Sequence, residues 1–553
     1  MAESLVIEKA LAAGGTALSA GAWSEARAAF EVGLSTAPSP ALFEGLSWAL
    51  WWLEDSTACL DARERAYNGF RQSDDARGAA RMALWLSDDH NEFLAASAVA
   101  EGWLRRAARI LEGMDPCEEH GWLAAFKAHS ALARQDYPVA LRQAREAQEY
   151  GRHHGSVDLQ MFGLASEGVV LIAQGNTPEG LICLDEATAA AINGEYSNLV
   201  PAAWACCLMM STCEQLRDID RGAQWCREID NFSRKRNVNF VVGVCGAHLG
   251  IIQLMRGNWA EAETSLTRSL EDLTTRRPAW RAEALVRLAQ LRLPQGRLEE
   301  AAALFEQAPD HPLAIEGKAG LSLMRNDPLG ARDLLERILR QSTSPPLVSQ
   351  VGALELLVRA CDSLEDHRSA AEYLEDLRLV AELVQTPHLV ATVAVCQGLI
   401  AASKAGYGDA CDQFEDAIDG FIRARTPVHA AIARLELAGT LIHLKRFDVA
   451  KRETLLAIAT FESIGAHWHL ARSRAVLQNI QLVRAGIPAA NRLTNRQIEV
   501  LRLVAAGLSD QEIAAELMLS HHTIHRHIAN IFNRLSCSTR AAAVAEAGRR
   551  GFL

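Results

Sequence analysis

A helix-pair unit recurs along most of this chain, and it constrains the fold more than any other feature. In its clearest copies, at 257–262 (GNWAEA) and 296–301 (GRLEEA), a turn leads into a helical segment with a small residue near its start. Such a unit cannot bury its apolar face alone, so neighbouring units must stack. The small residue recurs on average about every 39 residues, at Ala26, Ala62, Ala107, Ala140, Gly180, Ala223, Ala262, Ala301, Ala331, Ala370, Ala410 and Ala450. We predict an all-α chain with about twelve such pairs over residues 1–484.

The pattern resembles the tetratricopeptide repeat, in which small residues let paired helices approach closely while Phe or Tyr fills the groove between repeats. Its average spacing exceeds the ~34 residues of the standard unit and is similar to that of the superhelical domain of MalT-like regulators. The resemblance implies an α-solenoid superhelix with a long inner groove for a ligand or a protein partner. An unspecified α-solenoid with the same number of helices is the alternative.

Motifs of catalysis and cofactor binding are missing from the sequence. Only seven residues are Lys, and the nearest approach to a phosphate-binding loop is Gly317-Lys318-Ala319. No Gly-x-Gly-x-x-Gly follows a strand pattern, and neither His-Glu-x-x-His nor Gly-x-Ser-x-Gly occurs. The twelve Cys are scattered without a Cys-x-x-Cys pair, which is typical of buried apolar thiols. We therefore expect no enzyme activity, no cofactor and no metal site.

The sequence also argues against contact with a membrane. Its longest apolar stretches fall short of the ~18–20 residues that a bilayer span requires. The first ten residues contain Glu3 and Glu8 and lack a basic start before an apolar segment. We expect a cytoplasmic protein.

Charge is distributed unevenly along the chain. Residues 491–553 hold eight Arg, no Lys and five acidic residues, which gives +3, whereas the residues upstream carry −15. Contact with nucleic acid is therefore expected at the C-terminus.

A tryptophan stripe in the second repeat allows two interpretations. Trp48, Trp51 and Trp52 are spaced i, i+3 and i+4, which places them on one face of a helix. Indole rings on a concave wall could hold a ligand. The same spacing is also typical of side chains that fill the core of a helix pair.

The C-terminal segment has its own helix signals. Gly486 and Pro488 predict a linker over 485–491, followed by a separate domain over 492–553. Thr494 is expected to cap a first helix that ends at Gly507, and Ser509 with Glu512 forms a capping box for a second. Ser520 should cap a third helix from His521 to about Leu535, with apolar residues inward at Ile524, Ile528, Ile531 and Leu535. Two helices joined by a tight turn at 518–520 make a helix-turn-helix.

The same residues closely resemble the LuxR/FixJ family of DNA-binding domains. The matching positions are Leu493-Thr494-x-Arg496, Glu499-Val500-Leu501, Gly507-Leu508-Ser509, Glu512-Ile513-Ala514, Leu517, Ser520-x-x-Thr523-Ile524, His527, Asn530-Ile531 and Arg534-Leu535. The resemblance implies that the third helix enters the major groove and that a fourth, at about 539–549, supports dimerisation. Four positions depart from the usual pattern, with Gln497, Asp510, Ser536 and His525 in place of Glu, Asn, Gly and Lys.

Within this segment we predict distinct roles for the polar side chains. Arg526 is the best base reader, because its fork can bond guanine O6 and N7 together, although a phosphate contact is the alternative. Thr523 can bond a phosphate near the helix N-terminus. His527 and Asn530 would orient the backbone contacts, and Arg534 and Arg540 are either phosphate clamps or solvated charges. The predicted DNA-binding set is Ser520, His521, His522, Thr523, His525, Arg526, His527, Asn530, Arg534 and Arg540.

Together these features predict a transcription regulator that binds double-stranded DNA, as a homodimer on its target. Since neither an ATPase module nor a phosphorylatable receiver domain is found, we expect control through a small-molecule inducer or protein partner in the superhelix groove. The alternative is a scaffold or adaptor for protein assembly that has no specific DNA target.

Overall fold

The computed structural model describes residues 2–236, 238–273, 278–340, 348–484, 493–517, 519–550 and 552–553. Within these ranges the regular structure consists of 29 α-helices and one short 3-10 helix, without a β-strand. The all-α prediction is therefore confirmed. Residue contacts divide the chain into two compact units, one of residues 1–396 and 420–427 and the other of residues 397–419 and 428–553. The predicted linker, 485–491, lies outside the described residues.

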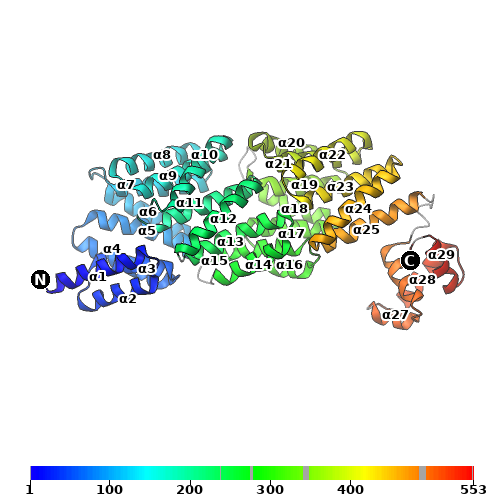
Figure 1. The fold of residues 1–553 in the computed structure, drawn as a ribbon, viewed down its shortest axis with the longest axis horizontal. Helices are drawn as coiled ribbons and strands as arrows, with labels where there is room; N and C mark the ends of the chain where they lie inside the picture. Colours follow the sequence, from blue (N-terminus) through cyan, green and yellow to red (C-terminus); the bar gives the residue numbers. More distant parts are fainter. Residues whose placement is uncertain are drawn as a thin grey trace. The chain divides into compact units, whose positions relative to one another are not determined.

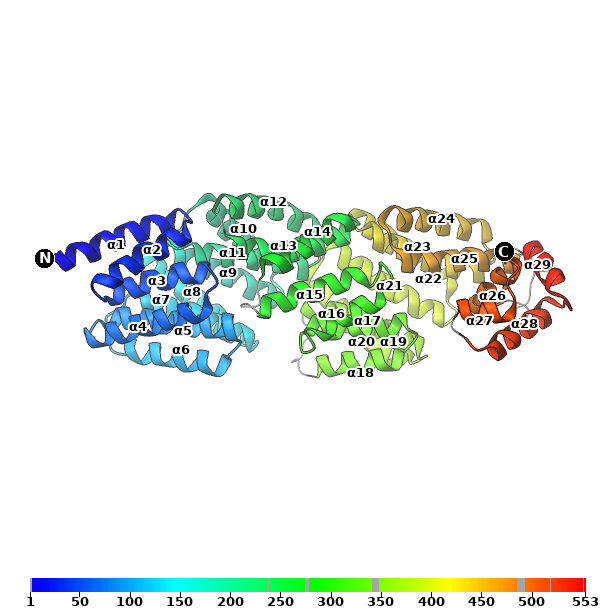
Figure 2. The same cartoon turned by 90° about the horizontal axis from the view of Figure 1, so that it is seen from below.

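The first unit is built from successive helix pairs. From α1–α2 to α19–α20, each odd-numbered helix packs against the even-numbered helix that follows it. Figure 1 and Figure 2 show these helices from two directions. Its helices are α1 (Ala2–Ser19), α2 (Trp23–Thr36), α3 (Pro40–Trp52), α4 (Ser56–Gln72), α5 (Ala76–Leu94), α6 (Ser97–Leu111), α7 (Glu118–Ala133), α8 (Tyr137–His154), α9 (Val157–Ala173), α10 (Thr177–Asn193), α11 (Leu199–Gln215), α12 (Ile219–Arg236), α13 (Asn239–Arg256), α14 (Trp259–Asp272), α15 (Pro278–Arg292), α16 (Leu298–Glu306), α17 (Pro312–Met324), α18 (Pro328–Leu339), η1 (Val348–Gln350), α19 (Val351–Ser363) and α20 (His367–Val384).

Helices α21 (Pro387–Ser403) and α22 (Tyr407–Arg423) each contribute residues to both units. The second unit continues with α23 (Pro427–His443), α24 (Phe447–Ile464) and α25 (His467–Arg484), and then with α26 (Asn495–Ala505), α27 (Asp510–Glu516), α28 (His521–Leu535) and α29 (Arg540–Arg549). We call α1–α25 the helix array and α26–α29 the C-terminal bundle.

The small residues that mark the repeat are buried in the helix array. Each of them falls on an even-numbered helix of the array and is buried. A Cβ on Gly180 of α10 would lie only 2.5 Å from the carbonyl oxygen of Gly168 on α9, so this pair packs backbone against backbone. A Cβ on Gly317 of α17 would overlap the ring of Phe305 from α16, which fills the space between two pairs as the repeat pattern predicts.

The tryptophan stripe packs inside the helix pairs. Trp51 is 1% exposed, and its ring centroid lies 4.8 Å from that of Trp52. Trp48 packs edge-on against Trp85 at 4.7 Å, and the guanidinium of Arg63 lies 4.3 Å from the Trp48 centroid. These contacts favour the core interpretation of the stripe over a ligand groove formed by Trp48, Trp51 and Trp52 themselves.

Other sequence expectations can be compared with the described residues. Ten of the twelve Cys are buried, which confirms the expected environment of those thiols. In the part of the chain that the structure describes, no group of three or more His, Cys, Asp or Glu is arranged to hold a metal. No described helix combines the length and the apolar character needed to cross a bilayer.

An ion pair without solvent access lies beside the tryptophan stripe. The Arg63 guanidinium of α4 contacts the Asp89 carboxylate of α5, and both side chains are 0% exposed. An Asp89→Asn change would leave a buried guanidinium without its counter-ion, so we expect a loss of about 3–5 kcal/mol of local stability. Hydrogen exchange of the α4 and α5 amides measures this loss.

The matched control is Glu31→Gln, which removes an ion pair between Arg27 and Glu31 whose side chains are 44% and 49% exposed. That change should cost less than about 1 kcal/mol. Equal effects of the two substitutions would contradict the role assigned to the buried pair.

Candidate nucleic-acid interface

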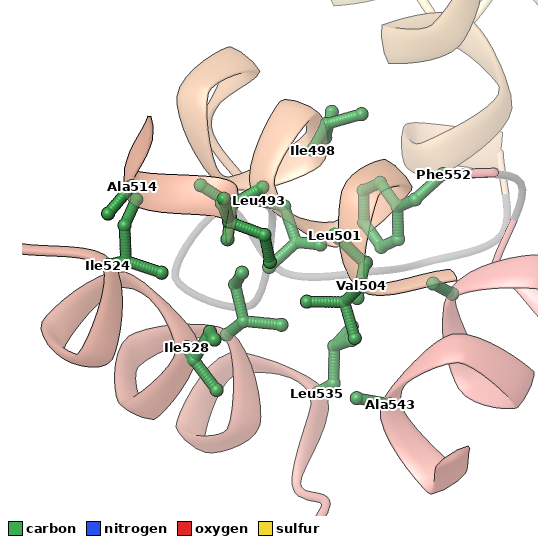
Figure 3. Packing of buried hydrophobic residues seen from close by; sticks show 14 of the residues in the cluster. Leu493, Ile498, Leu501, Val504, Ala514, Ile524, Ile528, Leu535, Ala543 and Phe552 are labelled. Carbon is green, nitrogen blue, oxygen red and sulfur yellow. The ribbon is translucent and has the colours of Figure 1, made fainter. Parts of the chain in front are cut away.

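The four helices of the C-terminal bundle surround one apolar core. Leu501 and Val504 of α26 point toward Ile528 and Leu535 of α28, with Ala543 of α29 and Phe552 beside them (Figure 3). Ile498 and Ile524 belong to the same cluster. Ile513 and Ala514 attach α27 to the same core. The inward face predicted for the third helix is therefore confirmed, and the opposite face of α28 is left toward solvent.

Local hydrogen bonds fix where these helices start. The Thr494 hydroxyl accepts from the backbone N–H of Gln497 at 3.3 Å, and the Gln497 Oε1 accepts from the Thr494 N–H at 3.0 Å. Ser509 and Glu512 form the same reciprocal pattern at α27. The Ser520 hydroxyl accepts from the Thr523 N–H at 3.1 Å, which begins α28 at His521. All three predicted caps are confirmed.

The end of α26 and the start of α29 also lie close to the positions that the sequence predicts. Gly507 follows α26 with φ of +88°, a conformation that favours glycine. Thr539 caps α29, so the fourth helix occupies Arg540–Arg549. Of the predicted turn at 518–520, Met518 lies outside the described residues.

The N-terminal turns of α28 present several polar side chains together. His521, His522, His525, Arg526 and Asn530 are all exposed. These five belong to the predicted DNA-binding set, and we call their exposed surface the reading face.

Two further members of the set, Thr523 and His527, are half-buried beside the reading face. The Thr523 hydroxyl shares a hydrogen bond of 2.7 Å with that of Ser520, which is exposed. Thr523 is therefore held next to the helix start.

The two arginines predicted as phosphate clamps have intramolecular partners. Arg534 Nη1 donates to Gln497 Oε1 at 3.0 Å, so it connects α28 to the cap of α26. Arg540 contacts the Asp510 carboxylate and donates through Nη1 to the carbonyl oxygen of Leu508 at 2.8 Å. These bonds favour a packing role for both residues.

Two departures from the LuxR pattern lie side by side. The His525 Nδ1 is 3.6 Å from the Asp510 Oδ2, on the same carboxylate that contacts Arg540. The sequence showed both substitutions but not that they meet, because they belong to different helices. A carboxylate held at this position reduces the positive potential of the reading face.

The charge environment of His527 differs from that of a free histidine. Partial burial of the ring, followed by the positive charges of Arg526 and Arg496, holds the pKa of His527 below its usual 6.5. Because the folded state binds this proton less tightly than the unfolded state, the stability contributed by neutral His527 is full above about pH 6.5. That contribution declines as the pH falls below this value.

An NMR titration of the His527 ring, assigned with a His527→Gln variant, should therefore give a midpoint below 6.5. Arg526→Ala should raise that midpoint, because it removes a nearby positive charge. A midpoint that stays unchanged in the Arg526 variant would show that Arg526 does not contribute to the shift.

Comparison with known proteins agrees with this geometry. Residues 491–547 match the family described as bacterial regulatory proteins, luxR family. The C-terminal segment of the chain is therefore a helix-turn-helix domain of the luxR family.

Individual relatives are similar over short stretches of the chain. Similarity extends to a nitrate/nitrite response regulator protein homolog of Haemophilus influenzae, 45% identical over 51 residues, which are 9% of this chain and 24% of that protein. It also extends to the probable transcriptional regulatory protein NarL of Mycobacterium tuberculosis, 44% identical over 66 residues, which are 12% of this chain and 31% of that protein. The chain thus spans about a quarter to a third of the length of these curated relatives.

Among solved structures, the APC/C hetero-tetramer Cut9–Hcn1 matches with a TM-score of 0.35 and 12% identity, over 83% of this chain and 95% of that one.

Proposed function

We propose that this protein is a transcription regulator that reads double-stranded DNA with α28. The observation that carries the proposal is the capped α27–α28 pair, whose second helix buries its apolar face and exposes the reading face. The luxR-family match over the same residues supports it. In a helix-turn-helix, the N-terminal residues of the second helix contact base edges while neighbouring groups hold the backbone.

Four residues of the reading face, and Thr523 beside it, have chemical tasks in this proposal. The exposed Arg526 guanidinium can donate two parallel hydrogen bonds to guanine O6 and N7, which distinguishes guanine from the other bases. Thr523 and the first backbone N–H groups of α28 would bond a phosphate. His521, His522 and His525 flank Arg526 and add polar contacts along the groove.

Control of the reading face is assigned to the helix array. Leu482 of α25 is buried in the same apolar cluster as the core of the C-terminal bundle, so the last array helix and the bundle share packing. A ligand or protein partner that favours one arrangement of this contact would shift the share of molecules able to bind DNA. Two reading faces on half-sites ~10 bp apart would require a homodimer, for which α29 is the candidate contact.

DNA binding is tested first through its dependence on salt. We expect the intact chain to bind a random duplex and to lose roughly 100-fold in affinity between 50 and 200 mM salt, as about four released counterions would cause. Fluorescence anisotropy measures both affinities, and the fragment 491–553 serves as a second sample. Failure of both samples to bind at 50 mM salt would favour the scaffold alternative.

Arg526→Ala tests the assignment of base reading. We expect it to cost about 1–3 kcal/mol at a selected target site and little on random duplexes, whereas Thr523→Ala should weaken both alike. Arg502→Ala, which removes an exposed arginine of α26, is the matched control for the loss of one charge. Equal losses on target and random DNA in the Arg526 variant would reassign this residue to a phosphate contact.

A further inference from the structure

A closed ring of helices in the first unit surrounds a cavity. Its walls come from six successive odd-numbered helices, α5, α7, α9, α11, α13 and α15, and its volume is about 320 Å³. The ring closes because α15 packs against α5. At that contact the Trp280 Nε1 donates a hydrogen bond of 2.9 Å to the Glu92 Oε2, although the two residues are 188 positions apart.

One side of the cavity is aromatic. Phe126, Phe162, Trp204 and Trp280 contribute rings from four different helices. The Trp204 ring centroid lies 5.0 Å from that of Phe162 and 6.2 Å from that of Phe126, so three of these rings form one continuous surface. Aromatic faces carry partial negative charge and attract cations.

Three acidic side chains line the cavity beside His129, His248 and Ser211. Asp88, Glu92 and Glu283 line it, and its described lining includes neither Lys nor Arg. The partner that Glu92 has in Trp280 is a neutral donor, which leaves the charge of this carboxylate in place.

Basic groups at the wall already face carboxylates. His248, which lines the cavity, lies with its Nδ1 2.7 Å from Glu214, and Arg63 interacts electrostatically with Asp88. Arg287 is 2% exposed and contacts both Glu283 and Glu214, so one guanidinium faces two carboxylates. Although burial opposes ionisation, Arg287 and His248 hold the pKa of Glu283 below its usual value, so this group is charged at neutral pH.

We propose that this cavity binds a small organic cation, in which a protonated amine or quaternary ammonium group is joined to an apolar or aromatic body. The carboxylates would neutralise the cationic group, and the rings would cover its body. The volume is in the range of small-molecule sites, and an adjoining cavity of about 270 Å³ that shares Asp88, Phe126 and His129 gives room for a longer substituent. Binding of the cation does not depend on binding of DNA. Only the regulatory consequence of cation binding rests on the proposed function.

The test uses the intact chain and three probes that share one ring system but differ in charge. Isothermal titration calorimetry at pH 7 should show that 2-naphthylmethylammonium binds at least 10-fold more tightly than neutral 2-naphthalenemethanol. Anionic 2-naphthoate should bind more weakly than the alcohol. Equal affinity for the three probes, or no binding of the ammonium compound at millimolar concentration, would overturn the proposal.

Two substitutions locate the binding to this cavity. Glu92→Gln removes the negative charge but keeps an oxygen that can accept the hydrogen bond from Trp280. Asp88→Asn removes the charge of the second carboxylate. Each should weaken binding of the ammonium probe about 5-fold or more, while Glu179→Gln, at an exposed acid of α10, should leave it unchanged. Thermal unfolding of each variant checks that the fold is intact, and unchanged probe affinity in both cavity variants would contradict the assignment.

A DNA-binding titration with and without the probe separates the two proposals. A probe that binds the cavity without altering DNA affinity would support the site and remove its regulatory role. If the chain binds no DNA with or without the probe, the proposed function fails, while the calorimetric result still supports the cation site.

Discussion

The close approach of paired helices is the constraint on which the array depends. Small residues on the even-numbered helices, such as Gly180 against the carbonyl of Gly168, allow contact at the level of the backbone. In the first unit the odd-numbered helices α5 to α15 line one cavity, and α15 packs against α5. Aromatic side chains connect the helix core to the cavity, because Trp85 packs against both Trp48 and Trp204. Through Trp85, the packing of Trp48 in the second repeat thereby supports the Trp204 ring in the cavity wall.

In the C-terminal bundle, local caps and a shared core place α28 so that one face is available. The charge on that face is set by contacts between helices. Asp510 contacts Arg540 and lies near His525, so the bundle holds an anion beside the side chains proposed to meet DNA. Because the Asp510 carboxylate offsets nearby positive charge, the reading face would gain modest affinity from phosphates. Its selectivity would depend more on base contacts.

The sequence predicted those features whose causes lie within a few residues. Thr494, Ser509 and Ser520 were identified as caps because a cap and its partner are three positions apart. The repeat markers were found because a period is a property of the sequence itself. The partners of Arg534 and Arg540 were missed, since Gln497 and Asp510 lie 37 and 30 positions away. The cavity was out of reach for the same reason, because its Glu92–Trp280 contact spans 188 positions and several complete repeats.

The central claim is that the intact chain selects particular DNA sequences through α28. Recovery and sequencing of genomic fragments bound by the intact chain, beside the Arg526→Ala variant, tests it most directly. We expect the intact chain to enrich a shared motif of two half-sites ~10 bp apart, which the variant no longer enriches. Recovery of fragments without any common motif, or the same motif from both proteins, would contradict it.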